Sequence, residues 1–479
     1  MSRRDVVFSL QSLLLGSLFL SGSGLARAQT FNVVDLDPGD PSGLYTNIAL
    51  DAADKAHVVF CEQGLTTENY LIKYATNSSG SWQLIYLPGS TSTDKKLYPS
   101  IAIGPDGNPK IVYYDGTVQH PMLVEKTGGG WTTPQVIDPT GNTGFYPHIA
   151  IDALGDVHVT YFVGAGGGSL GSLHYGYRAS GSQTWVLQTI DDRGPGWEIG
   201  TLNAIAVGAD NVPRVIYSVF LNGATEYTAV ARPGGSPTLC PPDGWCNENI
   251  HNAVPNGVSI AVAADGTEHT AFTVQNTCFY EKRSGGVWQS EVTVATGIQG
   301  PWPVDLAIDA GGTPAIAFSR ASDVALAVTD GTQWAIRSVA SAPSPRYASI
   351  GLNNGYLARI VYDRSTSGAT YAEQVLPVGV ADGQSWAKGV ALFNLGANPA
   401  HQGARFGVRL DVPQELRLSI YDASGRTVRV LADGSFPTGT HEFDWDLRET
   451  GGTRVGSGLY FVRLTAASGE RRGRMVVVQ

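Results

Sequence analysis

One short motif occurs seven times along the chain. Each copy has a short apolar run, a turn rich in Asp and Gly, and a strand that ends in an aromatic residue, as in YPSIAIGPDGNPKIVY from Tyr98. That order of residues predicts a β-hairpin. Successive copies lie between 44 and 56 residues apart, and a period of this size is typical of a propeller or a solenoid. The central apolar residues of the seven copies are Ile48, Ile101, Ile149, Ile205, Ile260, Leu306 and Ile350.

Each repeat has room for four strands. A third strand follows each hairpin, for example LIKYAT or LHYGYRA, and a fourth strand often begins with Trp. Charged residues make up 15% of the chain and glycines number 59, a composition that suits an all-β protein rich in turns. Four strands per unit are typical of a propeller blade. We expect the tryptophans that open the fourth strands to pack between blades: Trp82, Trp131, Trp185, Trp245, Trp288 and Trp334.

The two ends of the repeat region predict a closed ring. No Trp-led fourth strand follows the seventh hairpin, whereas segment 31–37, FNVVDLD, precedes the first hairpin and is similar to the fourth strands WQLIYL and WVLQTID. We therefore expect this segment to complete the seventh blade, which removes the exposed edges of an open sheet. The predicted fold is all-β, with a seven-bladed β-propeller over residues 29–378.

The N-terminus has the features of a secretory signal peptide. Arg3 and Arg4 precede an apolar run over residues 6–20, and Ala26-Arg27-Ala28 places small residues at the positions that a signal peptidase reads. We expect residues 1–28 to be removed and the mature chain to be secreted or held at the cell surface. A membrane anchor is disfavoured because the run is short and interrupted by polar residues, so the mature chain is expected to have no integral membrane segment.

The net charge and the cysteine content limit which partners and which cellular compartment suit this chain. The net charge of −10 argues against a nucleic-acid partner, whose phosphates need clustered Lys and Arg. Four cysteines fit an exported protein. Cys240 and Cys246 bracket the turn-rich sequence PPDGW, which predicts a local disulfide, and a metal site is disfavoured because no His pair at ligand spacing lies beside them. Cys61 and Cys278 are expected to be buried or free.

A separate module follows the repeats. Residues 379–389 form a predicted linker, and alternating strands with Gly turns over residues 390–479 predict a small immunoglobulin-like β-sandwich. Asn398-Pro399, IYDASGRTVRVL, the GTHEFDWD run, and GSGLYFVRL with the terminal RMVVV resemble the FlgD-like immunoglobulin domain. They also resemble the related C-terminal sorting domains of type IX secretion substrates.

This resemblance implies a bacterial protein that is extracellular or attached to the surface. The C-terminal module would act in secretion or anchoring, with the secretion machinery as its partner. Sorting domains of this family commonly end in a basic residue, whereas this chain ends in Gln479. A plain appended immunoglobulin-like domain therefore stays open as the alternative.

The position that ends the second strand of each hairpin is charged in four neighbouring blades. A closed ring would bring these blades side by side, so two arginines would lie next to two carboxylates. Such a group could bind a ligand, although charged loop tips that pair with one another at the surface are the ordinary alternative. The residues at this position, from blade one to blade seven, are Glu62, Asp115, Val163, Val219, Val274, Arg320 and Arg364.

Aromatic residues accompany these charges. Each precedes the inner strand of one of the same four blades. Aromatic platforms with convergent charged groups suit a sugar or an acidic glycan, and packing within the repeat is the alternative role of the tyrosines. The predicted ligand-binding residues are Arg320, Arg364, Tyr45, Tyr98, Tyr347 and Trp302.

A second ring of polar residues opens the second strands, near the opposite face. Its three histidines belong to blades one, three and five, too far apart to share one ion, so we expect each to form a hydrogen bond specific to its repeat. No metal or other cofactor is predicted. Gly166, Gly168 and Gly171 match G-x-G-x-x-G, but they lie between two strands, with no helix to bind an anion. The ring contains His57, Lys110, His158, Arg214, His269 and Arg359.

No catalytic motif decides the function. The sequence contains no HExxH and none of the Asp-boxes that mark sialidase blades. The leading hypothesis is a binding module for carbohydrate or an extracellular protein, rather than an enzyme. The alternative is a glycoside hydrolase or polysaccharide lyase with Glu62 and Asp115 as the acid and base. A third possibility is a structural scaffold with no small ligand.

Overall fold

The computed structural model describes most of the repeat region and of the C-terminal module. The described residues form 37 strands with turns between them and no helix, so no helix among them could cross a membrane. The predicted signal peptide and linker, residues 1–28 and 379–389, lie outside the described residues. The described residues are 30–38, 43–64, 69–91, 93–164, 170–221, 225–234, 244–298, 300, 304–309, 311–329, 331–353, 357–364, 368–375, 390–394, 400, 403–410 and 412–478.

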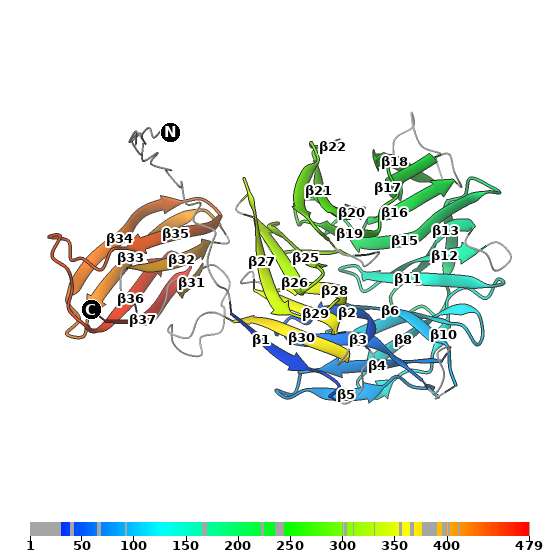
Figure 1. Cartoon of the computed structure of the whole chain (residues 1–479), viewed down its shortest axis with the longest axis horizontal. Coiled ribbons are helices and arrows are strands. Elements are labelled where there is room, and N and C mark those ends of the chain that lie inside the picture. Colours follow the sequence, from blue (N-terminus) through cyan, green and yellow to red (C-terminus); the bar gives the residue numbers. More distant parts are fainter. Residues whose placement is uncertain are drawn as a thin grey trace, which may run out of the picture.

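Seven antiparallel blades follow one another along the repeat region (Figure 1). Blade one contains β2 (Leu44–Leu50), β3 (Ala56–Gln63), β4 (Tyr70–Thr76) and β5 (Gln83–Tyr86). Blade two contains β6 (Lys96–Ile103), β7 (Pro109–Asp115), β8 (His120–Thr127), β9 (Gly130–Trp131) and β10 (Gln135–Val136). Blade three contains β11 (Thr143–Ile151), β12 (Val157–Gly164), β13 (Gly171–Arg178) and β14 (Val186–Asp191). Blades four and five contain β15 (Trp197–Val207), β16 (Pro213–Leu221), β17 (Thr225–Pro233) and β18 (Trp245–His251); and β19 (Gly257–Val262), β20 (Glu268–Val274), β21 (Thr277–Ser284), β22 (Val287–Trp288) and β23 (Val292–Thr296). Blades six and seven contain β24 (Asp305–Ile308), β25 (Pro314–Ser319), β26 (Asp323–Thr329) and β27 (Trp334–Ser341); and β28 (Arg346–Leu352), β29 (Ala358–Arg364), β30 (Gly368–Val375) and β1 (Thr30–Asp35).

The blades form a closed ring. Each inner strand contacts the inner strand of the next blade, in the order β2, β6, β11, β15, β19, β24 and β28, and β28 contacts β2. In Figure 1 the labelled inner strands lie toward the centre of the ring, namely β2, β6, β11, β15, β19 and β28, whereas β5 and β18 lie at its rim. Blades three and four are also joined by one parallel backbone pair, Gly171↔Glu198. The seven-bladed propeller predicted from the repeat is therefore confirmed.

The segment before the first hairpin connects the last blade to the first. β1 pairs antiparallel with β30 and is the outermost strand of blade seven. Leu36, directly after β1, is 6% exposed and donates its backbone N–H to the carbonyl oxygen of Ala369 at 2.9 Å. The buried ammonium group of Lys73 in β4 forms ion pairs with Asp37 and, at 2.9 Å, with Glu62. This segment thus contributes backbone, apolar and ionic contacts at the junction of blades seven and one.

Side chains near the axis connect the inner strands to one another. An inner strand has no strand partner on its axial side, so its free N–H groups need other acceptors. At five junctions, the residue before the central apolar residue of one blade accepts an N–H from the next blade. The pairs, acceptor first, are Asn47 Oδ1 with Ile101 N (2.9 Å), Ser100 Oγ with Ile149 N (3.4 Å), Ser259 Oγ with Leu306 N (3.0 Å), Asp305 Oδ2 with Ile350 N (2.9 Å) and Ser349 Oγ with Ile48 N (3.3 Å).

Tryptophans farther out pack against the preceding blade, as predicted. At four junctions a tryptophan ring meets a tyrosine ring of the preceding blade edge-on, with centroids 4.8 to 5.2 Å apart. Trp288 instead donates its indole N–H to Glu248 of blade four at 2.8 Å, and Trp185 packs against the apolar core that blades two and three share. The four stacked pairs are Trp131 with Tyr74, Trp245 with Tyr175, Trp334 with Tyr280 and Trp82 with Tyr371.

The three histidines of the second ring support these tyrosines. In blades one, three and five, the histidine Nδ1 lies 2.5 to 2.7 Å from the hydroxyl oxygen of the tyrosine that packs on the next tryptophan. Burial lowers the pKa of each histidine, that of His269 to about 4, so they are uncharged at neutral pH. The predicted repeat-specific hydrogen bond is therefore confirmed. The pairs are His57 with Tyr74, His158 with Tyr175 and His269 with Tyr280.

Glu281 in β21 makes the stability of blade five dependent on pH. Burial, and secondly the carboxylate of Glu291, raise the pKa of Glu281 from 4.5 to about 7. Because the folded state holds this proton more tightly than the unfolded chain, the contribution of Glu281 is fully present below pH 4.5 and is lost as the pH rises through 7. We expect Glu281→Gln to match the natural protein in stability at pH 4.5 and to exceed it by roughly 2–3 kcal/mol at pH 8.

Denaturant unfolding at the two pH values measures this difference. Glu226→Gln, at an exposed carboxylate of β17, is the control and should have the same small effect at both pH values. A Glu281→Gln variant that is no more stable than the natural protein at pH 8 would contradict the prediction.

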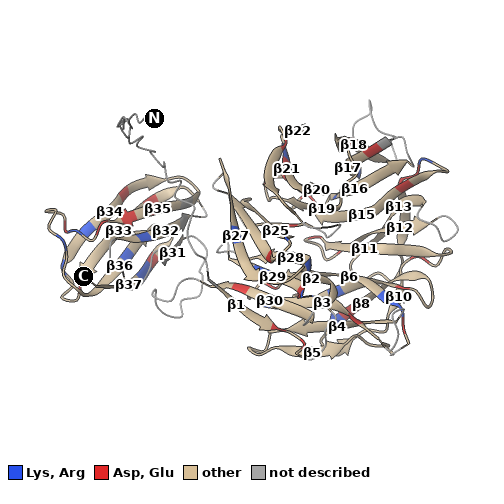
Figure 2. Ribbon diagram, in the orientation of Figure 1, with Lys and Arg blue, Asp and Glu red and all other residues tan. Residues whose placement is uncertain are grey.

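The C-terminal module is a sandwich of two sheets, as predicted, with a core formed only by residues 390–477. Its largest buried side chain is Trp445, which is 1% exposed, donates its indole N–H to the carbonyl oxygen of Arg448 at 3.0 Å and meets Tyr460 edge-on at 5.4 Å. One sheet contains β31 (Val390–Asn394), β32 (Ala404–Leu410) and β35 (Gly439–Trp445); the other contains β34 (Thr427–Phe436), β33 (Gln414–Asp422), β36 (Gly458–Ala466) and β37 (Gly469–Val477). Blue segments in Figure 2 mark Lys or Arg on several of these strands.

The three cysteines that the structure describes are in the states predicted from the sequence. Cys61 and Cys278 are free and buried, and burial raises the pKa of both thiols well above the usual range. The predicted state of these two residues is thus confirmed. Cys246 is disulfide-bonded, whereas its predicted partner, Cys240, lies outside the described residues.

Candidate functional site

Four tyrosines at the start of inner strands have an unusual backbone conformation. Their φ angles are 57° for Tyr45, 56° for Tyr98, 51° for Tyr146 and 54° for Tyr347, in a region that bulky residues rarely occupy. Each lies at a β-bulge, where two residues of the inner strand face one residue of the second strand. The facing residues are Phe60, Tyr113, Tyr161 and Tyr362, all buried. Bulges re-aim side chains, and such backbone strain concentrates at functional sites.

The bulges bring the four tyrosine rings into one continuous row, which we call the tyrosine arc. Ring centroids are 4.6 Å apart between Tyr347 and Tyr45, 4.6 Å between Tyr45 and Tyr98, and 4.4 Å between Tyr98 and Tyr146. The arc therefore spans blades seven, one, two and three. Burial raises the pKa of Tyr45 and Tyr98, and raises that of Tyr347 to about 12. These three hydroxyls consequently stay protonated at neutral pH.

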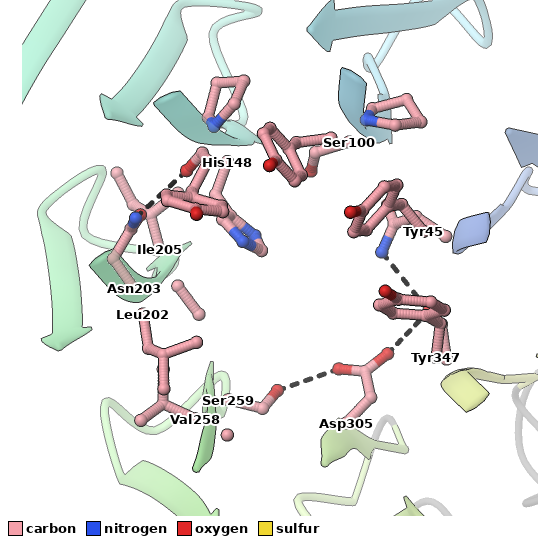
Figure 3. Close-up of a pocket in the computed structure, with 18 of the residues that line it drawn as sticks. Tyr45, Ser100, His148, Leu202, Asn203, Ile205, Val258, Ser259, Asp305 and Tyr347 are labelled. Carbon is pink, nitrogen blue, oxygen red and sulfur yellow. Dashed lines mark hydrogen bonds between the residues drawn. The ribbon is translucent and has the colours of Figure 1, made fainter. Parts of the chain in front are cut away.

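The tyrosine arc borders a cavity on the axis of the ring. The cavity has a volume of about 780 Å³ and is lined by residues from the inner strands of all seven blades. Figure 3 shows its lining side chains around an open centre, with Tyr45 and Tyr347 on one side and His148 and Asn203 on the other. A volume of this size lies within the range of pockets that bind small organic ligands.

Asp305 places a carboxylate in the wall of this cavity. Its Oδ1 accepts hydrogen bonds from the hydroxyl of Ser259 at 2.9 Å and from the N–H of Leu306 at 3.0 Å. Its Oδ2 accepts from the hydroxyl of Ser349 at 2.7 Å and from the N–H of Ile350 at 2.9 Å. These bonds favour the ionised form, but burial is the larger influence and raises the pKa of Asp305 above its ordinary value. The side chain therefore both joins blades five, six and seven and contributes a carboxyl group to the cavity.

Two further polar groups lie across the cavity from Asp305 (Figure 3). Burial lowers the pKa of His148 to about 4, so this imidazole is neutral at neutral pH. The side-chain amide of Asn203 donates to the carbonyl oxygens of Tyr146 and Gly200, both at 3.0 Å, and its Oδ1 accepts from Thr160 at 2.6 Å. The cavity thus combines an aromatic border with neutral hydrogen-bonding groups and a carboxyl group.

The structure brings together only some of the residues predicted to bind a ligand. Tyr45, Tyr98 and Tyr347 are adjacent and line the cavity, whereas Trp302 lies outside the described residues. Tyr146 also belongs to the arc, although it was not among the predicted site residues. The repeated Tyr-Pro pair at the start of its strand, also present at Tyr98, was the signal in the sequence that could have identified it.

The four charged residues of the predicted site have other partners. Glu62 pairs with Lys73 at 2.9 Å, and Asp115 accepts the N–H of Thr117 at 2.9 Å. Arg320 forms a two-bond ion pair with Asp323, three residues along, and Arg364 lies 3.6 Å from Asp35. None of the four is among the described residues that line the cavity. Within the described ranges, no ion pair joins either arginine to Glu62 or Asp115. Glu62, Arg320 and Arg364 pair with other charges, and Asp115 accepts a backbone N–H.

No group of three or more potential metal ligands occurs in the part of the chain that the structure describes. We therefore assign no residues to a metal. The arrangement instead defines a class: an all-β protein in which a seven-bladed propeller with an axial cavity precedes an immunoglobulin-like sandwich.

Comparison with known sequences identifies the C-terminal module. Residues 396–470 match the family model of the FlgD Ig-like domain. Over 75 residues the chain is 40% identical to the basal-body rod modification protein FlgD of Salmonella typhimurium, and the same holds for FlgD of Salmonella typhi. This match covers 15% of the present chain and 31% of FlgD, so the chain spans about a third of the length of the curated relatives it matches.

Comparison with solved structures agrees with the fold. PorZ, an essential bacterial surface component of the type-IX secretion system of Porphyromonas gingivalis, has a TM-score of 0.52 and 15% identity, over 92% of this chain and 60% of PorZ. The polysaccharide lyase Uly1 has a TM-score of 0.46 and 12% identity, over 75% of this chain and 94% of Uly1. At such low identity, the likeness to PorZ supports the architecture alone.

Proposed function

We propose that this chain is a secreted or cell-surface bacterial propeller that binds a carbohydrate at its axial cavity. The observation that carries the proposal is the tyrosine arc, in which four adjacent rings in a rare backbone conformation border a cavity of about 780 Å³. Packing alone would not require four bulky residues at positive φ, since glycine occupies that region without strain. The arc is therefore better explained by a ligand than by the repeat.

A sugar fits the chemistry of this cavity better than an apolar ligand does. Tyrosine rings offer flat apolar faces and a polar edge, which match the mixed surface of a pyranose. His148, Asn203 and Asp305 provide polar groups at the same cavity (Figure 3). An extracellular protein that inserts a side chain into the cavity is the other partner that this surface could accept.

The C-terminal module is proposed to act in secretion or anchoring. The match of residues 396–470 to the FlgD Ig-like domain supports an immunoglobulin-like module, and a sorting role with the secretion machinery as partner is our proposal. We also propose the domain boundaries: a signal peptide at 1–28, the propeller at 29–378, a linker at 379–389 and the sandwich at 390–479.

Retention of the full-length secreted chain on immobilised neutral and acidic polysaccharides tests the proposal. We expect retention on at least one polysaccharide, and a loss of about tenfold or more in affinity for Tyr98→Asn. Asparagine tolerates positive φ, so this change removes the ring without adding backbone strain. Tyr86→Asn, at an exposed tyrosine of β5, is the matched control and should bind normally. Absence of retention on the whole panel, or equal binding by Tyr98→Asn, would refute a carbohydrate site in this cavity.

A carbohydrate-active enzyme is the second candidate, because the cavity holds ionisable groups with displaced pKa values. Burial raises the pKa of Asp305 and lowers that of His148. Shifted pKa values of this kind are frequent at catalytic sites. Release of oligosaccharides during the same retention experiment would favour this candidate. Loss of products in Glu62→Gln or Asp115→Asn would place the chemistry at the outer loops, whereas loss in His148→Ala would place it in the cavity.

A further inference from the structure

We propose that the axial cavity selects a positively charged sugar, namely an amino sugar whose nitrogen is protonated, over neutral and acidic sugars. This inference rests on the proposed carbohydrate function and specifies its ligand. It also differs from the expectation of an acidic glycan held by arginines, because the arginines are paired elsewhere.

The charges of the cavity wall carry the inference. Among the described residues that line the cavity, the charged side chains are Glu198 and Asp305, and neither Lys nor Arg occurs. His148 adds no positive charge at neutral pH, because burial lowers its pKa to about 4. A ligand in this cavity therefore meets two carboxyl groups on the wall and no fixed positive charge.

These two carboxyl groups are not neutralised by neighbours. Asp305 accepts its hydrogen bonds from two serine hydroxyls and two backbone N–H groups. Glu198 accepts from the hydroxyl of Thr201 at 2.8 Å. In the described ranges neither takes part in an ion pair with Lys, Arg or His, although buried carboxylates elsewhere in the ring, such as Glu268, do so. An unpaired carboxylate in a concave, low-dielectric wall attracts a cation strongly.

The tyrosine arc adds a second attraction for the same kind of ligand. The face of an aromatic ring carries negative potential, so a cation placed over it is stabilised. Four adjacent rings along the border of the cavity and two carboxyl groups in its wall both favour an ammonium group. An acidic sugar would be repelled by the same groups, and a neutral sugar would gain only the stacking contribution.

Four hexasaccharides with the same β-1,4-linked glucose backbone provide the test. They are the glucosamine hexamer (cationic), the N-acetylglucosamine hexamer (neutral), cellohexaose (neutral) and the celluronic acid hexamer (anionic). Calorimetric titration of the full secreted chain at pH 5.5 and low salt should give the tightest binding for the glucosamine hexamer. We expect about tenfold or more over cellohexaose, a preference that falls as salt screens the charges.

Charge-removing variants separate this inference from general sugar binding. Glu198→Gln keeps an oxygen that can accept from Thr201 and should weaken the glucosamine hexamer about threefold or more while leaving cellohexaose unchanged. Glu226→Gln, outside the cavity, is the control and should change neither. Tighter binding of a neutral or acidic hexamer, or equal loss of all hexamers in Glu198→Gln, would overturn the charge preference and leave the carbohydrate site intact. If no hexamer binds, the preference is overturned, and the polysaccharide panel then decides whether the carbohydrate function fails as well.

Discussion

Replacement of Asp305 by alanine is expected to lower the free energy of unfolding of the propeller by about 3–5 kcal/mol. The side chain accepts hydrogen bonds from Ser259, Leu306, Ser349 and Ile350, which belong to blades five, six and seven. Alanine would remove the acceptor of the Ser259 and Ser349 hydroxyls and of the Ile350 N–H, whereas the Leu306 N–H keeps Ser259 Oγ. An unsatisfied buried donor costs more than a hydrogen bond contributes. The effect should therefore exceed that of losing one contact.

Denaturant unfolding of the purified full-length chain measures this loss. Ser259→Ala is the matched control, since it removes one of the partners of Asp305 and leaves the carboxylate with three donors. It should cost about 1 kcal/mol. A cost for Asp305→Ala no larger than that of Ser259→Ala would mean that the carboxylate does not hold the three blades together.

Deletion of residues 30–37 is expected to give aggregated or partly unfolded protein. Without β1, strand β30 becomes an open edge that can pair with another chain. The deletion also removes Leu36 from the core and leaves Lys73 without Asp37, and a buried charge that loses a partner is costly. Size-exclusion chromatography and thermal unfolding would measure both outcomes.

Point variants of the same segment provide a graded version of this test. Leu36→Ala should cost about 2–5 kcal/mol, as for other buried leucines. Val33→Ala, at a side chain of β1 that is 42% exposed, should cost well under 1 kcal/mol. A deletion variant that remains monomeric and unfolds at the same midpoint as the natural protein would show that the ring does not depend on β1.

The repeat made the architecture predictable. Seven copies of a hairpin with a constant aromatic ending determine the number of blades. The tryptophans were correctly expected to pack between blades, as Trp131 does against Tyr74. The histidines were also predictable as local hydrogen-bonding residues, because their blades alternate and cannot share an ion. These features repeat with the period of the fold, so a single sequence reveals them.

The candidate site was harder to predict because it depends on exceptions to the repeat. A bulge adds one residue to an inner strand and turns the tyrosine toward its neighbours, and nothing in the residue types alone specifies a positive φ at Tyr45. The four charged residues at the ends of the second strands do not line the cavity, for a related reason. Arg320 has Asp323 three residues away across a tight turn, and a local partner takes precedence over one in another blade.

The pairing of β1 with β30 also affects how the chain folds. The hydrogen bond between Thr370 and Asp35 joins residues 335 positions apart, so the ring closes through one of the most distant contacts in the chain. Contacts between residues so far apart in sequence form slowly, because the intervening chain must be ordered first. During synthesis or export, β1 emerges early and has no partner until blade seven follows it. Until then the chain is an open row of blades with exposed strand edges, and this is the stage at which chaperones would protect it most effectively from aggregation.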